Sequence, residues 1–254
     1  MKYGTKTIFN VALALVVSAF LAGCAGDSSN PYEVSDPFEG TNRAIFSFNN
    51  AVDHAVINPT IRGYRAVVPR PARNGVNNFL INLKSPVRFG NQLLQGDLEG
   101  AGNEFVRTSV NTLLGVGGIF DLAGYEGLEY ESEDFGQTLA VWGVGHGPYL
   151  VVPFLGPSSL RDYVGYAVDS FVDPLNMYLR NTGRDGVFYA RLGAEYFNLR
   201  DNLVDVLEDL EASSVDYYAA VRSTYYQSRD ALVKDQSSSV SAGPAIPDFD
   251  SEDY

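Results

Sequence analysis

Residues 158–172, SSLRDYVGYAVDSFV, carry the clearest helical pattern in the chain. Apolar side chains recur there at intervals of three and four residues, which places them on one side of an α-helix. They are Leu160, Tyr163, Val164, Ala167, Val168 and Phe171. Ser158 and Ser159 come just before this stripe, and serine is a preferred residue at a helix N-terminus because its hydroxyl accepts from free backbone N–H groups. The stretch therefore predicts an amphipathic helix that begins after a serine cap.

Similar periodicity occurs in segments on both sides of this helix, so we predict a mainly α fold. These segments are 38–57, 74–95, 97–114, 186–210 and 213–233. Pro86 predicts a kink or break in the second of them, because proline lacks the N–H of a helical hydrogen bond. Ser213 and Ser214 predict the cap of the last helix.

The helical faces are rich in aromatic residues, with 16 Tyr, 15 Phe and one Trp in the chain. Two interpretations fit this composition. Helices that lie at a membrane interface carry aromatic bodies on one face and polar residues on the other. A soluble helical core rich in aromatic residues is the alternative, and taken alone the sequence favours it.

One segment, residues 139–155, alternates with a period of two instead. Trp142, Val144 and His146 alternate with smaller residues, and the alternation resumes after Gly147-Pro148. This pattern predicts a glycine-rich β-hairpin with two largely apolar faces. Since a two-stranded ribbon is rarely stable alone, the hairpin should lie against helices or lipid.

The N-terminus has the order of a secretory signal peptide: basic residues Lys2 and Lys6, an apolar run over 8–22, then small residues. The apolar run is too short to span a bilayer comfortably. We predict a signal peptide over residues 1–23. Its end, Leu-Ala-Gly-Cys, resembles the lipobox of bacterial lipoproteins. That resemblance implies that Cys24 becomes the new N-terminus and carries a covalent lipid; an ordinary signal peptide with an accidental cysteine is the alternative.

The predicted mature chain begins and ends in polar segments. Residues 24–36 have the small, polar composition of a lipidated tether. Residues 235–254 carry five acidic residues and no basic one, which predicts a disordered acidic tail. The helical domain is therefore expected over 37–234. Ala25 follows Cys24, whereas Asp at that position resembles an inner-membrane retention signal, so sorting to the outer membrane is favoured.

Charge and cysteine content exclude several classes of protein. The formal net charge is −13, which disfavours binding to nucleic acid and electrostatic docking on anionic lipid. Cys24 is the only cysteine, so disulfides do not stabilise this exported chain. No apolar run after Cys24 reaches transmembrane length.

The sequence offers little catalytic or metal-binding chemistry, and we predict neither catalytic nor metal-binding residues. His54 and His146 lack a partner at metal-ligand spacing, and no nucleophile or phosphate-loop motif occurs. His54 is expected at the surface, and His146 at the hairpin tip. Residues 114–118, LGVGG, are better explained as a helix C-cap and chain reversal than as a nucleotide site. The acidic residues of 126–134 lack the pattern of a calcium loop and predict a solvated loop.

An ordered set of motifs nevertheless resembles a known family, the MlaA/VacJ outer-membrane lipoproteins, over about residues 36–230. The motifs are DPFEG (36–40) with NRA (42–44), PRPARNG (69–75) with NF (78–79), LQGD (94–97), NTLLG (111–115) with GG (117–118), FGQTL (135–139), WGVGHGPY (142–149) and LRD (160–162). The resemblance implies a ring-like bundle of amphipathic helices in the inner leaflet of the outer membrane, with an amphipathic channel. It implies transport of phospholipid misplaced in the outer leaflet to a periplasmic carrier, and association with a trimeric outer-membrane porin. No cofactor is expected beyond the covalent lipid on Cys24.

Two segments are candidates for control of such a channel. The hairpin within 135–160 is the candidate gate, because its glycines allow hinge motion and its faces are apolar. Its residues are Trp142, Gly143, Gly145 and Gly147. The helix over 38–57 is the candidate for controlling which leaflet the channel opens to, through Asn42, Ile45, Phe46 and Phe48.

Two functions of other classes stay open at this point. The first is a structural lipoprotein that braces a porin or an assembly complex and moves no lipid. The second is a lipoprotein hydrolase, in which Ser158 or Ser159 near Arg161 and Asp162 would form the site.

Overall fold

The computed structural model describes residues 36–234. The predicted signal peptide, Cys24, all of the predicted tether except residue 36, and the predicted tail lie outside the described residues. Within 36–234 the chain is mainly helical with one small sheet, as predicted. Its elements are α2 (Glu39–Val52), the π-helical turn η2 (Asp53–Ile57), α3 (Asn58–Val67), α4 (Arg70–Gln95), α5 (Leu98–Leu113), α6 (Leu122–Tyr125), α7 (Phe135–Val141), β1 (Tyr149–Val152), β2 (Gly156–Ser159), α8 (Leu160–Val172), α9 (Pro174–Asn181), α10 (Asp185–Ser213) and α11 (Tyr217–Val233).

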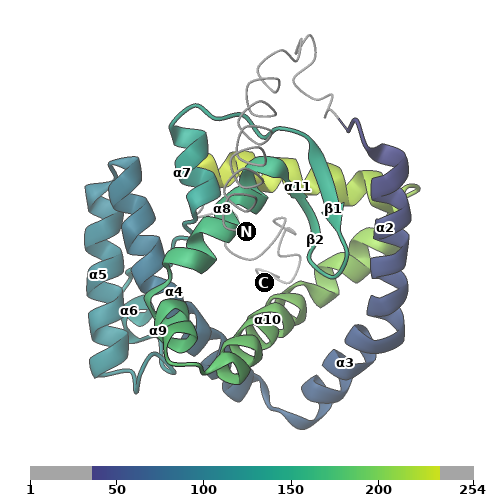
Figure 1. The fold of residues 1–254 in the computed structure, drawn as a ribbon. Coiled ribbons are helices and arrows are strands. Elements are labelled where there is room, and N and C mark those ends of the chain that lie inside the picture. The colour runs from purple at the N-terminus through teal and green to yellow at the C-terminus, as the bar shows by residue number, and fades with distance from the viewer. Residues whose placement is uncertain (1–35, 235–254) are drawn as a thin grey trace, which may run out of the picture.

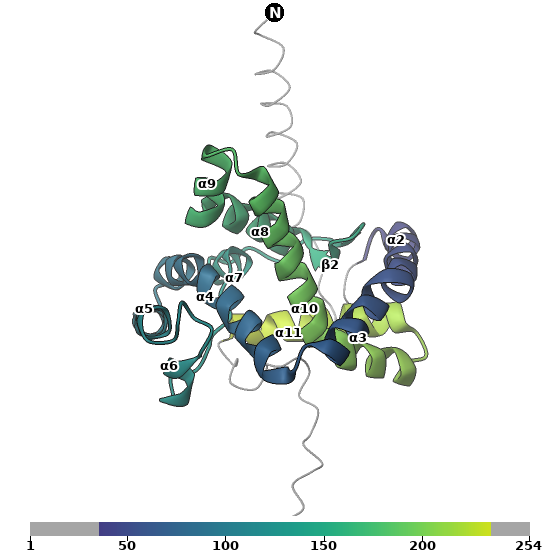
Figure 2. The same ribbon diagram turned by 90° about the horizontal axis from the view of Figure 1, so that it is seen from below.

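The helices form a ring (Figure 1). Helix α4 packs on α5 and α7, α8 packs on α7 and α9, and α10 packs on α9, α11 and α3. The small β-sheet lies inside the ring beside α2 and α11. In the view turned by 90°, α9 projects from one side of the ring and α6 from the other (Figure 2). The ring-like arrangement of amphipathic helices is therefore confirmed.

Side-chain caps set the start of several helices. The Ser159 side chain accepts from Asp162 N at the start of α8, as predicted. The last helix differs from the prediction: α10 continues through Ser213, and Asp216 caps α11 by accepting from Ala219 N. Ser213 Oγ donates to Asp209 O within α10, so this serine stays helical.

Pro86 neither ends nor divides α4, so of the predicted kink or break the break is wrong. Arg88, which follows Pro86, donates from Nη1 to the Ile81 carbonyl oxygen at 2.8 Å in the preceding part of the helix. Packing on α5 and α7 and this hydrogen bond hold the helix together across the proline.

The β-hairpin exists, but further along the chain than predicted. Its strands β1 and β2 pair antiparallel from Tyr149–Ser159 to Val152–Gly156. Residues 135–141 are helix α7, because the Asp134 side chain accepts from Gln137 N and so caps a helix. The turn lies at 153–155, where Phe154 has a φ of 65°, and Gly156, the first residue of β2, has a φ of 88°.

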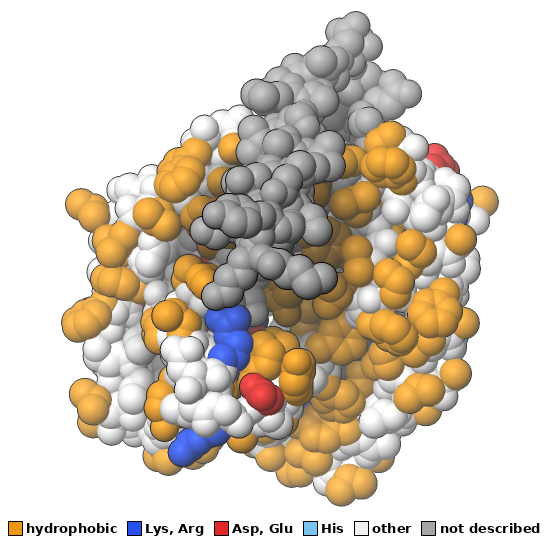
Figure 3. All heavy atoms as spheres, viewed as in Figure 1, with side chains coloured by type: hydrophobic (Ala, Val, Ile, Leu, Met, Phe, Trp, Pro, Cys, Tyr) orange, Lys and Arg blue, Asp and Glu red, His pale blue; other side chains and the backbone are white. Residues whose placement is uncertain are grey.

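The distribution of polar and apolar side chains is reversed from that of an ordinary soluble core. Among the described residues, 18 buried side chains are polar or charged and 10 are hydrophobic. Many large apolar side chains are exposed instead, including Leu113 at 80% and Leu98 at 72%. Hydrophobic side chains spread over most of the face in Figure 3, and few charged ones reach it. Exposed apolar area on this scale marks a membrane or protein contact, which favours interfacial helices over the soluble core.

No helix among residues 36–234 combines the length and the apolar character needed to cross a membrane.

The crossing of α7 and α8 depends on two glycines and gives a first prediction. A Cβ on Gly165 would lie 2.7 Å from Gly136 Cα, closer than atoms can approach. We expect Gly165→Ala to lower the free energy of unfolding by about 1–3 kcal/mol, as overpacking does. Gly193→Ala in α10 is the matched control, since nothing lies within 4 Å of its added Cβ. It should raise stability by about 0.5–1 kcal/mol. Equal effects of the two substitutions in denaturant unfolding would contradict this.

Candidate functional site

A cavity of about 940 Å³ lies inside the ring, lined mainly by α4, α5, α8, α10 and α11. Its walls combine many polar side chains with a larger exposed area of apolar ones. Seven asparagines line it: Asn77, Asn78, Asn82, Asn111, Asn176, Asn198 and Asn202. Eight carboxylates line it as well: Glu104, Asp121, Glu133, Asp134, Asp162, Asp169, Asp173 and Glu195. Apolar and aromatic side chains such as Leu199, Tyr163 and Tyr166 complete the lining. The cavity is thus amphipathic, inside a ring whose outer surface is apolar.

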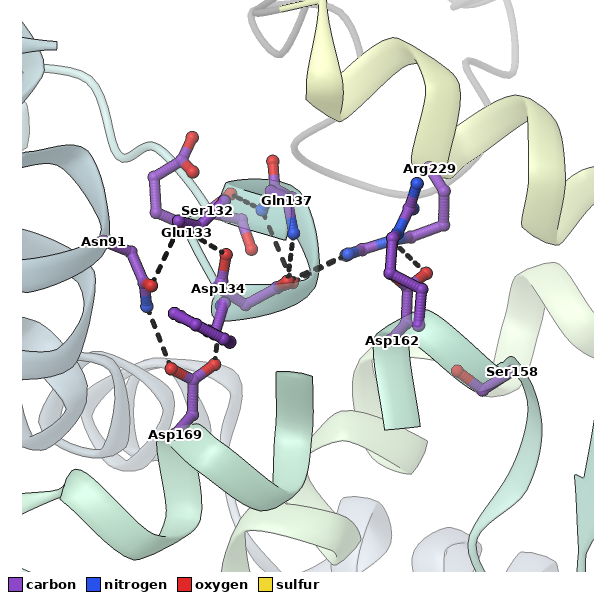
Figure 4. A network of polar contacts seen from close by, with 12 residues as sticks. Asn91, Ser132, Glu133, Asp134, Gln137, Ser158, Asp162, Asp169 and Arg229 are labelled. Atoms are coloured by element: carbon purple, nitrogen blue, oxygen red, sulfur yellow. Dashed lines mark hydrogen bonds and ion pairs between the residues drawn. The ribbon is translucent and has the colours of Figure 1, made fainter. Parts of the chain in front are cut away.

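One polar network closes the wall between α7, α8 and α11 (Figure 4). Arg229 of α11 donates from Nη1 and Nη2 to the two oxygens of Asp134, at 2.6 and 2.9 Å. Its Nε lies 2.9 Å from Asp162 Oδ2 as an ion pair, without hydrogen-bond geometry. Arg161 Nε donates to the other Asp162 oxygen at 2.8 Å. Burial raises the pKa of Asp162, but the charges of Arg229 and Arg161 outweigh it and lower the pKa to about 2.

A second network, around Asp169 of α8, is built differently (Figure 4). Asp169 accepts from Asn91 Nδ2 of α4 and from Phe135 N of α7, both at 2.9 Å. Thr138 Oγ1 donates to Asn91 Oδ1 at 2.9 Å and so orients the amide. Burial raises the pKa of Asp169 to about 6, and the two hydrogen bonds only partly oppose this.

Asp169 therefore gives a prediction for acid stability. Its folded pKa of about 6 lies above the usual value of about 3.9. Between about pH 4 and 6 the native state holds the proton more tightly than the unfolded chain, so stability should fall as pH rises through this window. We expect a contribution of about 3 kcal/mol, which Asp169→Asn should remove. Urea unfolding at several pH values measures it. Identical pH slopes in the two proteins would contradict the assignment.

The predicted leaflet-control helix is fastened to the hairpin by two asparagines. Asn42 of α2 is buried; its Nδ2 donates to the Tyr149 carbonyl at 2.9 Å and its Oδ1 accepts from Val151 N at 3.0 Å. Asn49 repeats the pattern, donating to Val152 O at 3.0 Å and accepting from Phe154 N at 2.9 Å. The asparagine side chains thereby satisfy the open edge of β1 as a third strand would.

The other residues of this predicted set divide between core and surface. Ile45 and Phe46 pack against the hydrophobic cluster of Tyr149, Val151 and Tyr218. Phe48 is 48% exposed, with its ring edge-to-face on Phe154. Their control of leaflet choice stays a prediction.

The predicted gate residues do not lie in the hairpin strands but in the connection from α7 to β1. Trp142 Nε1 donates to Leu94 O at 3.1 Å, which fastens the start of this connection to α4. Gly143 and Gly147 have φ of 88° and 67°, a backbone region that favours glycine. A Cβ added at Gly145 would have no neighbour within 4 Å beyond the adjacent residues. Their gating role also stays a prediction.

Within residues 36–234, the two histidines and the candidate serines do not form a nucleophile–base pair. His146 is not at the hairpin tip: its Nε2 lies 3.0 Å from Asp230 Oδ1 and its ring packs on Tyr226. His54 is exposed and pairs with Glu211, as expected for a surface residue. Ser158 Oγ hydrogen-bonds with Tyr225. Among residues 36–234 no group of three or more potential ligands could hold a metal ion.

The loops singled out in the sequence have structural roles. Gly117 and Gly118 have positive φ and reverse the chain after α5, as predicted. The acidic loop is less solvated than expected, because Glu131 and Glu133 accept from Gln92 and Gln95 of α4.

Sequence reasoning missed Asn49, Lys84 and Asp169 as cavity or hairpin residues. The seven-residue spacing from Asn42 to Asn49, two helical turns, was the one available signal.

Comparison with known proteins is consistent with this geometry. The family model for the MlaA lipoprotein matches residues 34–232. The chain belongs to the MlaA lipoprotein family. It is 37% identical over 225 residues to the MlaA lipoprotein of the intermembrane phospholipid transport system of Escherichia coli (strain K12), covering 87% of each chain. The corresponding MlaA of Haemophilus influenzae is 30% identical over 237 residues, covering 91% of this chain and 92% of the relative. A chain solved in work on the structural basis for maintenance of bacterial outer membrane lipid asymmetry superposes with a TM-score of 0.68 at 38% identity, covering 78% of this chain and 99% of that one.

Proposed function

We propose that this protein is a lipid-anchored outer-membrane component that removes misplaced phospholipid from the outer leaflet and passes it to a periplasmic carrier. The observation that carries the proposal is the amphipathic cavity of about 940 Å³ inside a ring with an apolar outer surface. A phospholipid has a polar headgroup and apolar tails, so its path across a leaflet needs a polar lining next to an apolar surface. A ring of amphipathic helices supplies both.

The relatives support the same role. Those in Escherichia coli and Haemophilus influenzae are lipoproteins of an intermembrane phospholipid transport system. Movement of a lipid breaks no covalent bond, so we propose that the protein is not an enzyme. The lack of a nucleophile–base pair among the histidines and the candidate serines agrees with this.

The anchor and partners follow from the same proposal. Lipid on Cys24 would hold the ring at the periplasmic face of the outer membrane, and additional acyl chains would make this anchoring stable. A trimeric porin in the membrane would contact the apolar outer surface, and a soluble periplasmic carrier would receive the lipid.

The proposal is tested by blocking the cavity. Leu199 lines it and is 56% exposed, so a tryptophan there should narrow the path. We expect Leu199→Trp to raise the amount of phospholipid at the cell surface that an added phospholipase can reach, in cells whose only copy is this variant. Leu113→Trp is the matched control, since Leu113 is 80% exposed and does not line the cavity.

The outcomes separate the alternatives. If both variants behave as the unmodified protein, and mass spectrometry finds no phospholipid bound to the purified protein, a structural lipoprotein that braces a porin or an assembly complex explains the protein better. Loss of function on Ser158→Ala with lipid binding intact would indicate a hydrolase.

A further inference from the structure

The basic side chains of the cavity are of two kinds. The three arginines that line it are at most 12% exposed, and each is neutralised by a carboxylate: Arg88 by Glu104, Arg107 by Asp121, and Arg229 by Asp134 and Asp162. They therefore belong to the wall. Lys84 of α4 is different, because its side chain is 45% exposed inside the lining. Apart from Lys234 at the end of α11, it is the only lysine among residues 36–234.

Lys84 is also free to change partners without leaving a charge uncompensated. Its Nζ lies 3.0 Å from Glu195 Oε2. The other oxygen of Glu195 accepts from Arg191 Nε at 2.8 Å, so Glu195 keeps a cation when Lys84 moves away. A lysine ammonium on a flexible stem is a mobile positive charge, unlike a guanidinium held by two oxygens.

Among the carboxylates of the lining, Asp169 differs from most of the others because no basic side chain pairs with it. Asp169 receives hydrogen bonds from neutral donors only, Asn91 Nδ2 and Phe135 N, and among residues 36–234 it has no ion-pair partner within 4 Å. By contrast six of the eight lining carboxylates pair with a basic side chain, namely Asp121, Asp134, Asp162, Asp173, Glu104 and Glu195. The eighth, Glu133, accepts from Gln95 Nε2 at 2.6 Å. A carboxylate that is partly removed from water and has no cation gains most from a cation that enters the cavity.

Lys84 and Asp169 lie on the same side of the cavity. Lys84 and Asn91 are seven residues apart on α4, two turns on the same face, or about 10 Å along the axis. Asn91 hydrogen-bonds to Asp169, and the charge of Lys84 acts on that carboxyl group. The flexible stem of Lys84 lets its ammonium move along this face, so a positive and a negative charge are available within reach of one headgroup.

We propose that Lys84 and Asp169 form a subsite for a zwitterionic phospholipid headgroup that bears a primary amine, with the phosphate at Lys84 Nζ and the ammonium at Asp169. This inference rests on the proposed function and names the lipid class that it favours. A primary ammonium donates up to three hydrogen bonds, and charge-assisted bonds to a carboxylate are the stronger kind. A headgroup with phosphate but no ammonium gains only the Lys84 contact and places its negative charge near Asp169. The subsite should therefore discriminate against anionic lipids.

The test uses the purified full-length lipoprotein, equilibrated with detergent micelles that contain equal amounts of phosphatidylethanolamine and phosphatidylglycerol. Bound lipid is measured by native mass spectrometry. We expect the unmodified protein to enrich phosphatidylethanolamine, and Asp169→Asn to reduce that enrichment by about tenfold or to the ratio of the micelle. Lys84→Gln should reduce binding of both lipids with little change in their ratio, and Lys84→Arg should restore it. Lys234→Gln and Glu126→Gln, exposed and outside the lining, are the matched controls.

Each result has a defined meaning. If the unmodified protein binds lipid without preference, or if Lys84→Gln binds as much as the unmodified protein, the headgroup subsite is wrong while the proposed function stands. If the unmodified protein binds neither lipid, the proposed function itself fails. If soluble glycerophosphoethanolamine binds as tightly as the lipid, the subsite belongs to a soluble ligand and the lipid assignment is overturned. Should Asp169→Asn fail to fold by circular dichroism, the Lys84→Gln and Lys84→Arg pair decides the question.

Discussion

Replacing Arg229 with methionine should lower the free energy of unfolding by about 3–5 kcal/mol, the usual cost of removing one partner of a buried ion pair. Arg229 is 12% exposed and is the group through which α11 holds both α7 and α8. The substitution leaves Asp162, 8% exposed, with Arg161 as its only cation beside the Tyr225 hydroxyl, and leaves Asp134 without its two hydrogen bonds from Arg229. Asp134 and Asp162 then lie close together inside the wall, and only one of the two neighbouring arginines, Arg161, remains.

Denaturant unfolding followed by circular dichroism measures this effect. Arg43→Met is the matched control: Arg43 also joins two carboxylates, Glu39 and Asp216, but its side chain is 39% exposed. Exposed pairs contribute about 0–1 kcal/mol, so the control should change stability little. A loss of the same size for both variants would show that the network contributes no more than a surface pair.

The helices could be predicted from the sequence, because each has one face that packs and one that does not. The stripe from Leu160 to Phe171 and the serine before it are local features, and they determine where α8 begins and which side it buries. The cap of α11 was misassigned because Ser214 and Asp216 are both good capping residues. Only the observed bond from Ala219 N to Asp216 distinguishes them.

The hairpin was misplaced because residues 139–147 alternate as a strand does, while their conformation is decided elsewhere. Phe135 N is bound by Asp169, a residue that lies 34 positions further along the chain. Asp134 is held by Arg229, 95 positions away. These contacts, with the cap at Gln137, fix helix α7, and no window of local sequence contains them.

The cavity was beyond the reach of sequence patterns for a different reason. A helix with one polar face has the same pattern of residues whether that face points to bulk water or into a cavity. Lys84 and Asn91 lie on such a face of α4, and Asp169 lies on such a face of α8. Only closure of the ring turns these faces inward. The family resemblance supplied the expectation of an amphipathic channel, whereas the particular residues had to come from the structure.

Deletion of Ser47 should disconnect α2 from the hairpin and change the phospholipid content of the outer leaflet. Asn42 and Asn49 are seven residues apart and share one face of α2, which lets both reach β1. Removing one residue between them rotates one asparagine by about 100° relative to the other. Both can then no longer face the strand, and backbone groups of β1 lose their partners. Ser47 is exposed and its hydroxyl donates only within its own helix, so the deletion removes no contact of its own.

Two measurements check this prediction. Amide exchange at Phe154 should accelerate by about fivefold, since its hydrogen bond to Asn49 lies at the surface and such a bond contributes about 1 kcal/mol net. Phospholipase-accessible phospholipid at the cell surface should change in cells that carry only the deletion variant. Ser47→Ala keeps the spacing of the asparagines and should match the unmodified protein in both. If the deletion variant accelerates exchange at Phe154 but leaves the surface lipid unchanged, the asparagine lock is structural and α2 does not control leaflet choice. If neither quantity changes, the seven-residue register is not what joins α2 to the hairpin.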